Sequence, residues 1–322
     1  MRRLKMSRDS RSEQGGVSVI VAMMLVVLLG FAAIAVDVSM MYAERTQLRN
    51  GADAAALAIA QKCAKSQTDP DCITTSSLAA GLANRNANDG LSNLKSVAID
   101  TIGRTVAVTA GSQEAGQSLN QVSLFFARAL GVYSTEVNAS ASAQWGTPSK
   151  GPAILPLAIA SCKLDIPPGG TQGSVQVLEQ SVNGCGGLPG GFGWITTSGS
   201  QCSVTMTAGQ PDNSGIWFAS DPGASAPTVC TAADFSQMND QTVLLPLYDL
   251  ATGTGSSGKF YVKGFAAFHV TGYQFASISW TTGGNVQNKT IRGYFVKFVS
   301  LAQAFELGSV PNYGATIVRL TP

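Results

Sequence analysis

Residues 14–60 read QGGVSVIVAMMLVVLLGFAAIAVDVSMMYAERTQLRNGADAAALAIA, and this stretch decides the architecture of the chain. Its first part, residues 17–36, contains twenty residues without a charge or a proline. At a rise of about 1.5 Å per residue, a helix of this length spans about 30 Å, the thickness of the hydrocarbon core of a bilayer. The sequence therefore predicts a transmembrane helix over residues 17–36.

The residues before the apolar stretch predict its orientation. Asp9 and Glu13 oppose five basic side chains in the first fourteen residues, which leaves a net charge of +3 there against +2 for all 322 residues. The basic side chains are Arg2, Arg3, Lys5, Arg8 and Arg11. By the positive-inside rule, residues 1–16 form a cytoplasmic tail and the C-terminal part lies outside the cytoplasm. The alternative is a signal peptide cleaved after Ala33-Ile34-Ala35, but the apolar stretch exceeds the roughly 7 to 15 residues usual there.

The helical pattern continues beyond the membrane segment. Apolar and small residues recur at steps of three and four, the spacing that lines one face of a helix. This face, the predicted partner-helix stripe, consists of Val38, Met41, Leu48, Ala52, Ala55 and Ile59, and only Arg45 interrupts it. Two interpretations stay open. The stripe is either the core side of a helix packed on its own domain, or the seam of a stalk that packs on equivalent helices of partner subunits.

The same stretch resembles the N-terminal region of TadG-like proteins of the tight-adherence (Flp-type) pilus machinery. Members show an apolar span that ends in an Ala-Val-Asp-Val-like boundary, an aromatic and a basic residue, and a Gln-Leu-x-Asn-x-Ala-Asp-Ala-Ala-Ala-Leu run. The matching positions here are Asp37, Tyr42, Arg45, Gln47, Leu48, Asn50, Ala52, Asp53 and Ala54 to Leu57. The resemblance continues through Val106 to Thr109, Leu124 to Gly131 and Val137 to Ala143, where the family has a strand, a helix and a strand. It thus covers residues 14–146, and the rest of the chain is similar more loosely.

The resemblance implies a single-pass protein of the inner membrane that acts in pilus assembly or adherence and is no enzyme, either as an assembly platform or as a minor-pilin-like subunit. The implied partners are TadE-like and TadF-like subunits and, through residues 17–36, the membrane. Two family features are missing. The fifth residue after Gly15 or Gly16 is Ile20 or Val21 in place of the glutamate of prepilins, and the stretch that begins at Asp37 lacks the Asp-x-Ser-x-Ser metal motif of longer members.

The rest of the sequence predicts an α+β chain with two extracytoplasmic regions. Residues 37–146 are expected to hold the stalk helix and a small sheet, with a strand-turn-strand over 96–109 and a helix over 118–130 that Gly131 ends. The stretch GTPSKGP at 146–152 reads as a linker. Residues 147–322 are expected to form a β-rich, sandwich-like domain. Its short apolar runs cover 153–159, 174–178, 243–248, 260–270, 275–280 and 291–301.

Six cysteines follow the membrane segment, and an even count on the exported side predicts disulfides. Cys63 and Cys72 close a short loop and are expected to pair. The other four, Cys162, Cys185, Cys202 and Cys230, allow three pairings, which all stay open. Zinc is not expected, because no two cysteines have the close spacing that zinc sites use.

The composition offers little catalytic chemistry and no basic surface for nucleic acid. His269 is the single histidine and reads as a strand residue, and no G-x-S-x-G motif is present. The glycine-rich stretch 184–194 lacks the G-K-[ST] ending of a phosphate loop and reads as a turn. We therefore expect no cofactor, metal site or catalytic residue. The alternative function is a tethered or secreted module that binds surface carbohydrate through Trp194, Trp217 or Trp280.

Overall fold

The computed structural model describes residues 13–167, 170–180, 188–197, 199–209, 216–223, 225–301, 304–308 and 310–321. Its helices are α1 Glu13–Lys65, α2 Ser77–Asn86 and α3 Ala232–Ser236, with short 3-10 helices η1 Ala127–Leu130, η2 Ser161–Lys163 and η3 Gly255–Ser257. The first strands are β1 Ser92–Asp100, β2 Thr105–Ser112, β3 Gln121–Ser123, β4 Ser134–Glu136, β5 Asn138–Ala153, β6 Leu157–Ala160, β7 Gln176–Glu179, β8 Phe192–Trp194 and β9 Val204–Thr207. The later strands are β10 Trp217–Ala219, β11 Thr242–Thr252, β12 Lys259–Phe275, β13 Ile278–Thr281, β14 Thr290–Val296, β15 Phe298–Ser300, β16 Glu306–Gly308 and β17 Ala315–Thr321.

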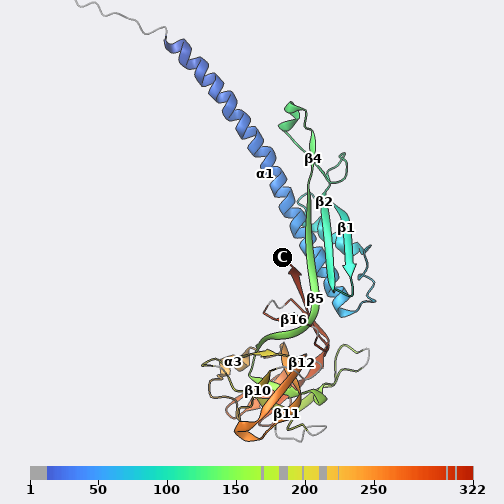
Figure 1. Cartoon of the computed structure of the whole chain (residues 1–322), viewed down its shortest axis with the longest axis vertical. Coiled ribbons are helices and arrows are strands. Elements are labelled where there is room, and N and C mark those ends of the chain that lie inside the picture. Colours follow the sequence, from blue (N-terminus) through green and yellow to red (C-terminus); the bar gives the residue numbers. More distant parts are fainter. Residues whose placement is uncertain are drawn as a thin grey trace, which may run out of the picture. The chain divides into compact units, whose positions relative to one another are not determined.

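Helix α1 is the long blue ribbon of Figure 1 and runs without a break for 53 residues. It joins the apolar stretch and the alanine-rich stretch into one element, as the sequence pattern predicts. Alanine has the highest helix propensity of all residues, and residues 52–60 contain six alanines. The predicted α+β class, with an N-terminal helix followed by sheets, is therefore confirmed.

The described chain divides into two compact units, and both take segments from several parts of the sequence. The first unit contains the chain up to Ala55 together with Ser77–Val97 and Ala107–Ala141. The second contains Ala56–Ser76, Ala98–Val106 and the chain from Ser142 on. The division cuts β5 near residue 141, whereas the predicted boundary at residue 146 stays a prediction.

In the first unit, α2 packs against α1 where both helices carry small residues. A Cβ atom placed on Gly51 of α1 would lie 3.1 Å from the Cα of Ala83 in α2. Ala83 and Ala79 are buried on the side of α2 that faces inward. The strands of this unit follow the order β1, β2, β5, and β3 and β4 form a separate two-stranded hairpin. Glycine at position 51 therefore allows the two helix backbones to approach closely.

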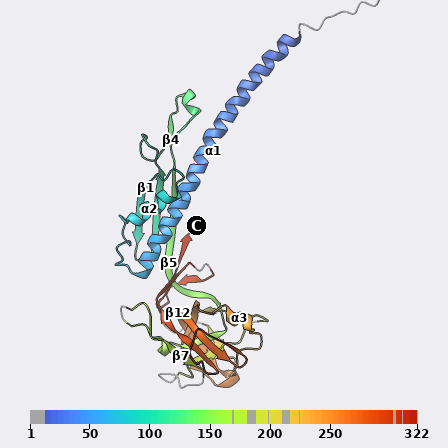
Figure 2. The same cartoon turned by 180° about the vertical axis from the view of Figure 1, so that it is seen from behind.

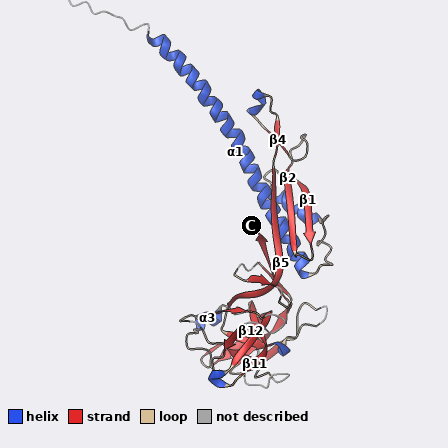
Figure 3. Cartoon of the chain, viewed as in Figure 1, coloured by secondary structure: helices blue, strands red, loops and turns tan. Residues whose placement is uncertain are grey.

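The second unit is built on a sheet of eight strands, shown in red in Figure 3. Its path is β7-β14-β12-β11-β6-β8, and β10 and β13 also pair with β12. All these pairs are antiparallel except β11 with β6. Each of the six apolar runs expected in this region contains at least part of a strand.

Both faces of this sheet are buried. One face carries a cluster that includes Trp194, Phe235 and Phe275. The other face packs Tyr248 and Phe265 against side chains from strands β9 and β17 of the neighbouring sheet. Along β5, the partner strand changes from β17 to β16 and then to β9. Two packed sheets with a shared core are the arrangement expected for a sandwich-like domain.

Two sequence-based predictions are wrong in this region. Residues 118–130 do not form a helix, because β3, a loop and η1 occupy them, although Gly131 does adopt the left-handed conformation expected at a helix end, with φ 82°. Residues 146–152 are no linker and lie inside β5. Gly151 is required there for packing, since a Cβ atom at this position would collide with the ring of Phe305.

Candidate membrane and assembly interface

The apolar half of α1 is exposed in the isolated chain. All described side chains from 17 to 36 are exposed except Ala33, which is partly covered. Among the described helices, α1 has the length and composition needed to cross a membrane. A row of exposed valine, leucine, isoleucine and methionine side chains costs free energy in water and is favourable in hydrocarbon. This half of α1 therefore has the properties of a membrane anchor.

The predicted partner-helix stripe divides into an exposed and a buried part. Val38 is exposed and Met41 is half-buried. Leu48, Ala52, Ala55 and Ile59 are buried within the chain itself. As long as α1 packs in this way, Val38 and Met41 are the stripe residues that can be reached from outside the chain. The exposed turns also present Met40 and Tyr42, and the side chain of Tyr42 is 75% exposed.

Asp37, the first residue after the apolar stretch, holds the tip of the β3–β4 hairpin. Its Oδ1 accepts hydrogen bonds from the backbone N–H of Phe125 at 2.9 Å and of Phe126 at 3.1 Å. Its Oδ2 accepts from the N–H of Phe126 at 3.0 Å and of Ala127 at 2.7 Å. A carboxylate is the side chain suited to several converging N–H donors, because it offers two oxygens and a full negative charge.

These contacts shift the protonation of Asp37. Burial raises the pKa of this carboxyl, but the N–H groups of Ala127, Phe126 and Phe125 lower it further than burial raises it. The net pKa lies below the ordinary value of 3.8, so Asp37 is ionised at neutral pH. Sequence reasoning recognised Asp37 only as part of the boundary motif. Its partners lie 88 to 90 residues away in the chain, and no local pattern connects them.

Other residues of the motif bind the α2 region of the same unit. The Oε1 of Gln47 accepts a hydrogen bond from the backbone N–H of Asn88 at 2.7 Å. Leu48 and Ala52 are buried beside Gly51, where α2 makes its close approach. Asp53 instead pairs with Arg49 along the helix surface at 3.6 Å. The motif therefore serves largely to attach α1 to the domain that follows it.

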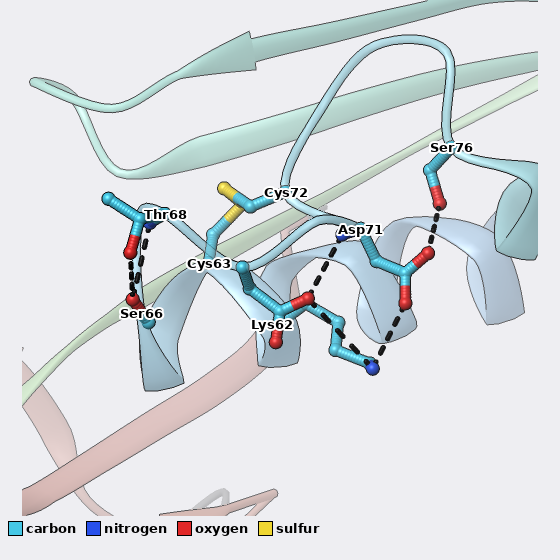
Figure 4. A network of polar contacts seen from close by, with 8 residues as sticks. Lys62, Cys63, Ser66, Thr68, Asp71, Cys72 and Ser76 are labelled. Atoms are coloured by element: carbon cyan, nitrogen blue, oxygen red, sulfur yellow. Dashed lines mark hydrogen bonds and ion pairs between the residues drawn. A yellow bond between two sulfur atoms is a disulfide. The ribbon is translucent and has the colours of Figure 1, made fainter.

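A disulfide and a polar network lie at the C-terminal end of α1, as Figure 4 shows. Cys63 of the last helical turns is bonded to Cys72 of the following loop. Next to it, Lys62 pairs with Asp71 at 3.0 Å, and the hydroxyl of Ser76 donates to Asp71 at 3.0 Å. The hydrogen bond from Lys62 and that from Ser76 lower the pKa of Asp71. This network fixes the return of the chain toward α2.

A second disulfide joins Cys202 to Cys230. Cys162 is also disulfide-bonded, while Cys185 lies outside the described residues. No cysteine is free in the part of the chain that the structure describes. The described cysteines thus have the oxidised state expected for an exported chain.

His269 lies between two polar neighbours on the surface of the sheet. Its Nδ1 is 3.1 Å from the hydroxyl of Thr242, which is its register partner on β11, and its Nε2 is 3.1 Å from Asp240. The imidazole also stacks on Tyr294. The order Thr-His-Asp resembles a catalytic triad, but in a triad the acid orients Nδ1 and the nucleophile faces Nε2.

The three tryptophans proposed as sugar platforms contribute to packing. Trp194 is 1% exposed and lies 5.2 Å from the ring of Phe275. Trp217 is half-buried against Tyr261, and Trp280 is 6.1 Å from Tyr273. A cavity of about 550 Å³ lies beside Trp194. Because Trp194 is so deeply buried, it does not present the open ring face on which a sugar stacks.

Metal-binding groups are also sparse. The described residues contain no cluster of three or more histidine, cysteine, aspartate or glutamate side chains that could hold a metal ion. The carboxylate of Asp37, which begins the stretch nearest in sequence to the Asp-x-Ser-x-Ser metal motif, binds the hairpin tip. Asp234 has a structural role, since it caps α3 by accepting from the N–H of Thr231 at 2.7 Å.

Residues 15–62 match the Tad family, described as "Putative Flp pilus-assembly TadE/G-like". This match covers the apolar half of α1, Asp37 and most of the helix that packs on the first unit. No curated protein and no solved structure matches the chain. Over these residues, the chain is thus similar to TadE/G-like proteins of Flp pilus assembly.

Proposed function

We propose that the protein is a membrane-anchored accessory or minor-pilin-like component of the Flp pilus that acts by protein–protein assembly and adherence, without catalysis. The observation that carries the proposal is the two-part helix α1. Its residues 17–36 are apolar and exposed, and its continuation from Leu48 is buried in the folded chain. A single rigid element therefore connects an anchor to an exported domain.

The proposed orientation places the N-terminal tail in the cytoplasm and the two compact units outside the inner membrane. Five basic residues before the apolar stretch support this orientation. The disulfides Cys63–Cys72 and Cys202–Cys230 support it independently, because disulfides persist in oxidising compartments.

The proposed partner surface is the exposed membrane-proximal part of α1 around Val38 and Tyr42. It lies at the end of the anchor and remains accessible when the domain has folded. TadE-like or TadF-like subunits with similar anchors are the proposed partners, since neighbouring transmembrane helices bring such surfaces together.

The test is photo-crosslinking in cells from single positions of the full chain. A photoreactive residue at Val38 or Tyr42 is expected to capture other pilus subunits, and one at Leu91, an exposed position of the same unit, is the control. In parallel, a strain that lacks the gene is complemented with the wild-type chain or with Tyr42→Asp. We expect the wild type to restore surface pili and the variant to restore fewer. Normal pili and adherence in the deletion strain would refute the proposed function.

A further inference from the structure

The tip of the β3–β4 hairpin exposes an apolar surface. Over residues 124–133, Phe125 is 69% exposed and Leu130 is 79% exposed. The exposed large apolar side chains of this tip are Phe125, Phe126, Leu130, Val132 and Tyr133. We propose that this tip lies in the headgroup region of the bilayer and forms a second membrane contact of the protein beside the anchor helix.

The position of the tip carries the proposal. Asp37 follows the last residue of the apolar stretch directly, and it binds the backbone of Phe125, Phe126 and Ala127 at 2.7 to 3.1 Å. When residues 17–36 span the hydrocarbon core, this hydrogen-bonded group lies at the membrane surface. Figures 1 and 2 show the hairpin beside α1, with its tip on the side of the apolar half of the helix.

The tip is also rigidly built. Strands β3 and β4 pair at Gln121 with Glu136 and at Ser123 with Ser134, and the N–H of Leu124 donates to the carbonyl of Tyr133 at 2.9 Å. Leu124 itself is buried beneath the turn. The exposure of the apolar side chains is therefore a consequence of a defined backbone conformation that turns them outward.

The chemistry of the tip fits a lipid surface. Residues 124–133 contain no acidic side chain, and the exposed Arg128 adds a positive charge that favours anionic headgroups. Aromatic side chains are enriched at membrane interfaces, and interfacial segments insert their apolar face about 5 to 10 Å. These observations point to a bilayer as the partner of the tip, because the apolar tip lies beside the end of the anchor and continues its apolar surface.

The proposal rests on the membrane anchoring proposed above, and the experiment separates the two. A photoreactive residue replaces Phe125, Leu130, Leu91 or Leu25, one at a time, in the full chain in cell membranes. Leu25 lies within the anchor and reports whether the anchor meets lipid. Leu91 is 37% exposed and lies close in sequence to Asn88. The backbone of Asn88 binds Gln47 of α1, and Gln47 lies ten residues, or about 15 Å along the helix, from Asp37. Leu91 is thus a matched apolar control away from the membrane.

We expect phospholipid adducts at Phe125 and Leu130, at least tenfold more abundant than at Leu91. Lipid adducts at Leu25 with none at Phe125 and Leu130 would overturn the second contact and leave the anchor intact. Adducts of Phe125 and Leu130 with protein in place of lipid would also overturn it, because the occupant would then be a subunit. Absence of lipid adducts at Leu25 would refute the anchor itself. Because the replaced side chains at the tip are exposed, the substitution does not disturb the core.

Discussion

Replacement of Leu48 by alanine tests whether the buried half of α1 is the core of its own unit. Leu48 is 2% exposed, and Leu48→Ala removes three carbon atoms from this environment. At about 0.8 kcal/mol for each buried carbon, the lost transfer free energy is about 2.4 kcal/mol. The residual cavity adds to this value, and buried leucine-to-alanine changes generally cost about 2 to 5 kcal/mol. We expect a loss of about 3 kcal/mol in the free energy of unfolding of the first unit.

Hydrogen exchange of the full chain in detergent micelles measures this loss locally. Helix α2 packs one turn away, at Gly51, so its amides report on the opening of the unit. A loss of about 3 kcal/mol corresponds to a decrease of about 100-fold in the protection of these amides. Val38→Ala is the control, since Val38 is exposed and its truncation is expected to change stability by less than about 0.5 kcal/mol.

One result would refute the assignment of Leu48 to the core of its own unit. If Leu48→Ala changed the protection of α2 by less than about threefold but removed the protein from assembled pili, Leu48 would belong to a seam between subunits. The stalk interpretation of the stripe would then replace the core interpretation for the buried positions as well.

Three further predictions follow from the same contacts. Replacement of Cys63 and Cys72 by serine opens a loop with a sequence separation of nine, and we expect it to cost about 3 kcal/mol in thermal or denaturant unfolding; unchanged stability would contradict this expectation. Gly51→Val forces a branched side chain against Ala83, so we expect a loss of about 1 to 3 kcal/mol, visible as faster exchange in α2. The folded pKa of Asp37 lies below its unfolded value, so its contribution to stability is present at neutral pH and is lost as the pH falls through the folded pKa. The protection of the hairpin-tip amides, relative to their intrinsic exchange rate at each pH, is therefore expected to fall in acid in the wild type, whereas Asp37→Asn should show low protection at every pH.

The sequence patterns predicted the elements with a strong hydrophobic signal. The alanine-rich helix and most strands of the second unit carry this signal because they are buried in the chain, whereas the apolar stretch carries it with its side chains exposed. The prediction failed at residues 118–130, where Leu119, Val122, Phe126 and Leu130 recur at helical spacing. Val122 is buried from strand β3, whereas the other three side chains are exposed in the folded chain, so their spacing does not report a core-facing helix. An apolar pattern cannot distinguish side chains that face a protein core from those that face other surroundings.

Contacts between distant parts of the sequence escaped prediction altogether. Glycine and proline in 146–152 suggested a linker, but β5 continues through them because its pairing partner changes along its length. The role of Asp37 depends on a turn that follows 88 residues later. The sequence pattern identified Asp37 as a family feature. Only the folded structure shows which backbone N–H groups donate hydrogen bonds to its carboxylate.

The hydrogen bonds of Asp37 also impose an order of events on biosynthesis. The anchor and Asp37 leave the ribosome first, and the donors at Phe125 to Ala127 follow about 90 residues later. At about 5 to 20 residues per second, this interval lasts roughly 5 to 20 seconds. During that time the carboxylate of Asp37 lacks its native donors and the alanine-rich face of α1 lacks its cover. The nascent chain thus passes through a stage in which the apolar half of α1 is complete while the first unit is still open.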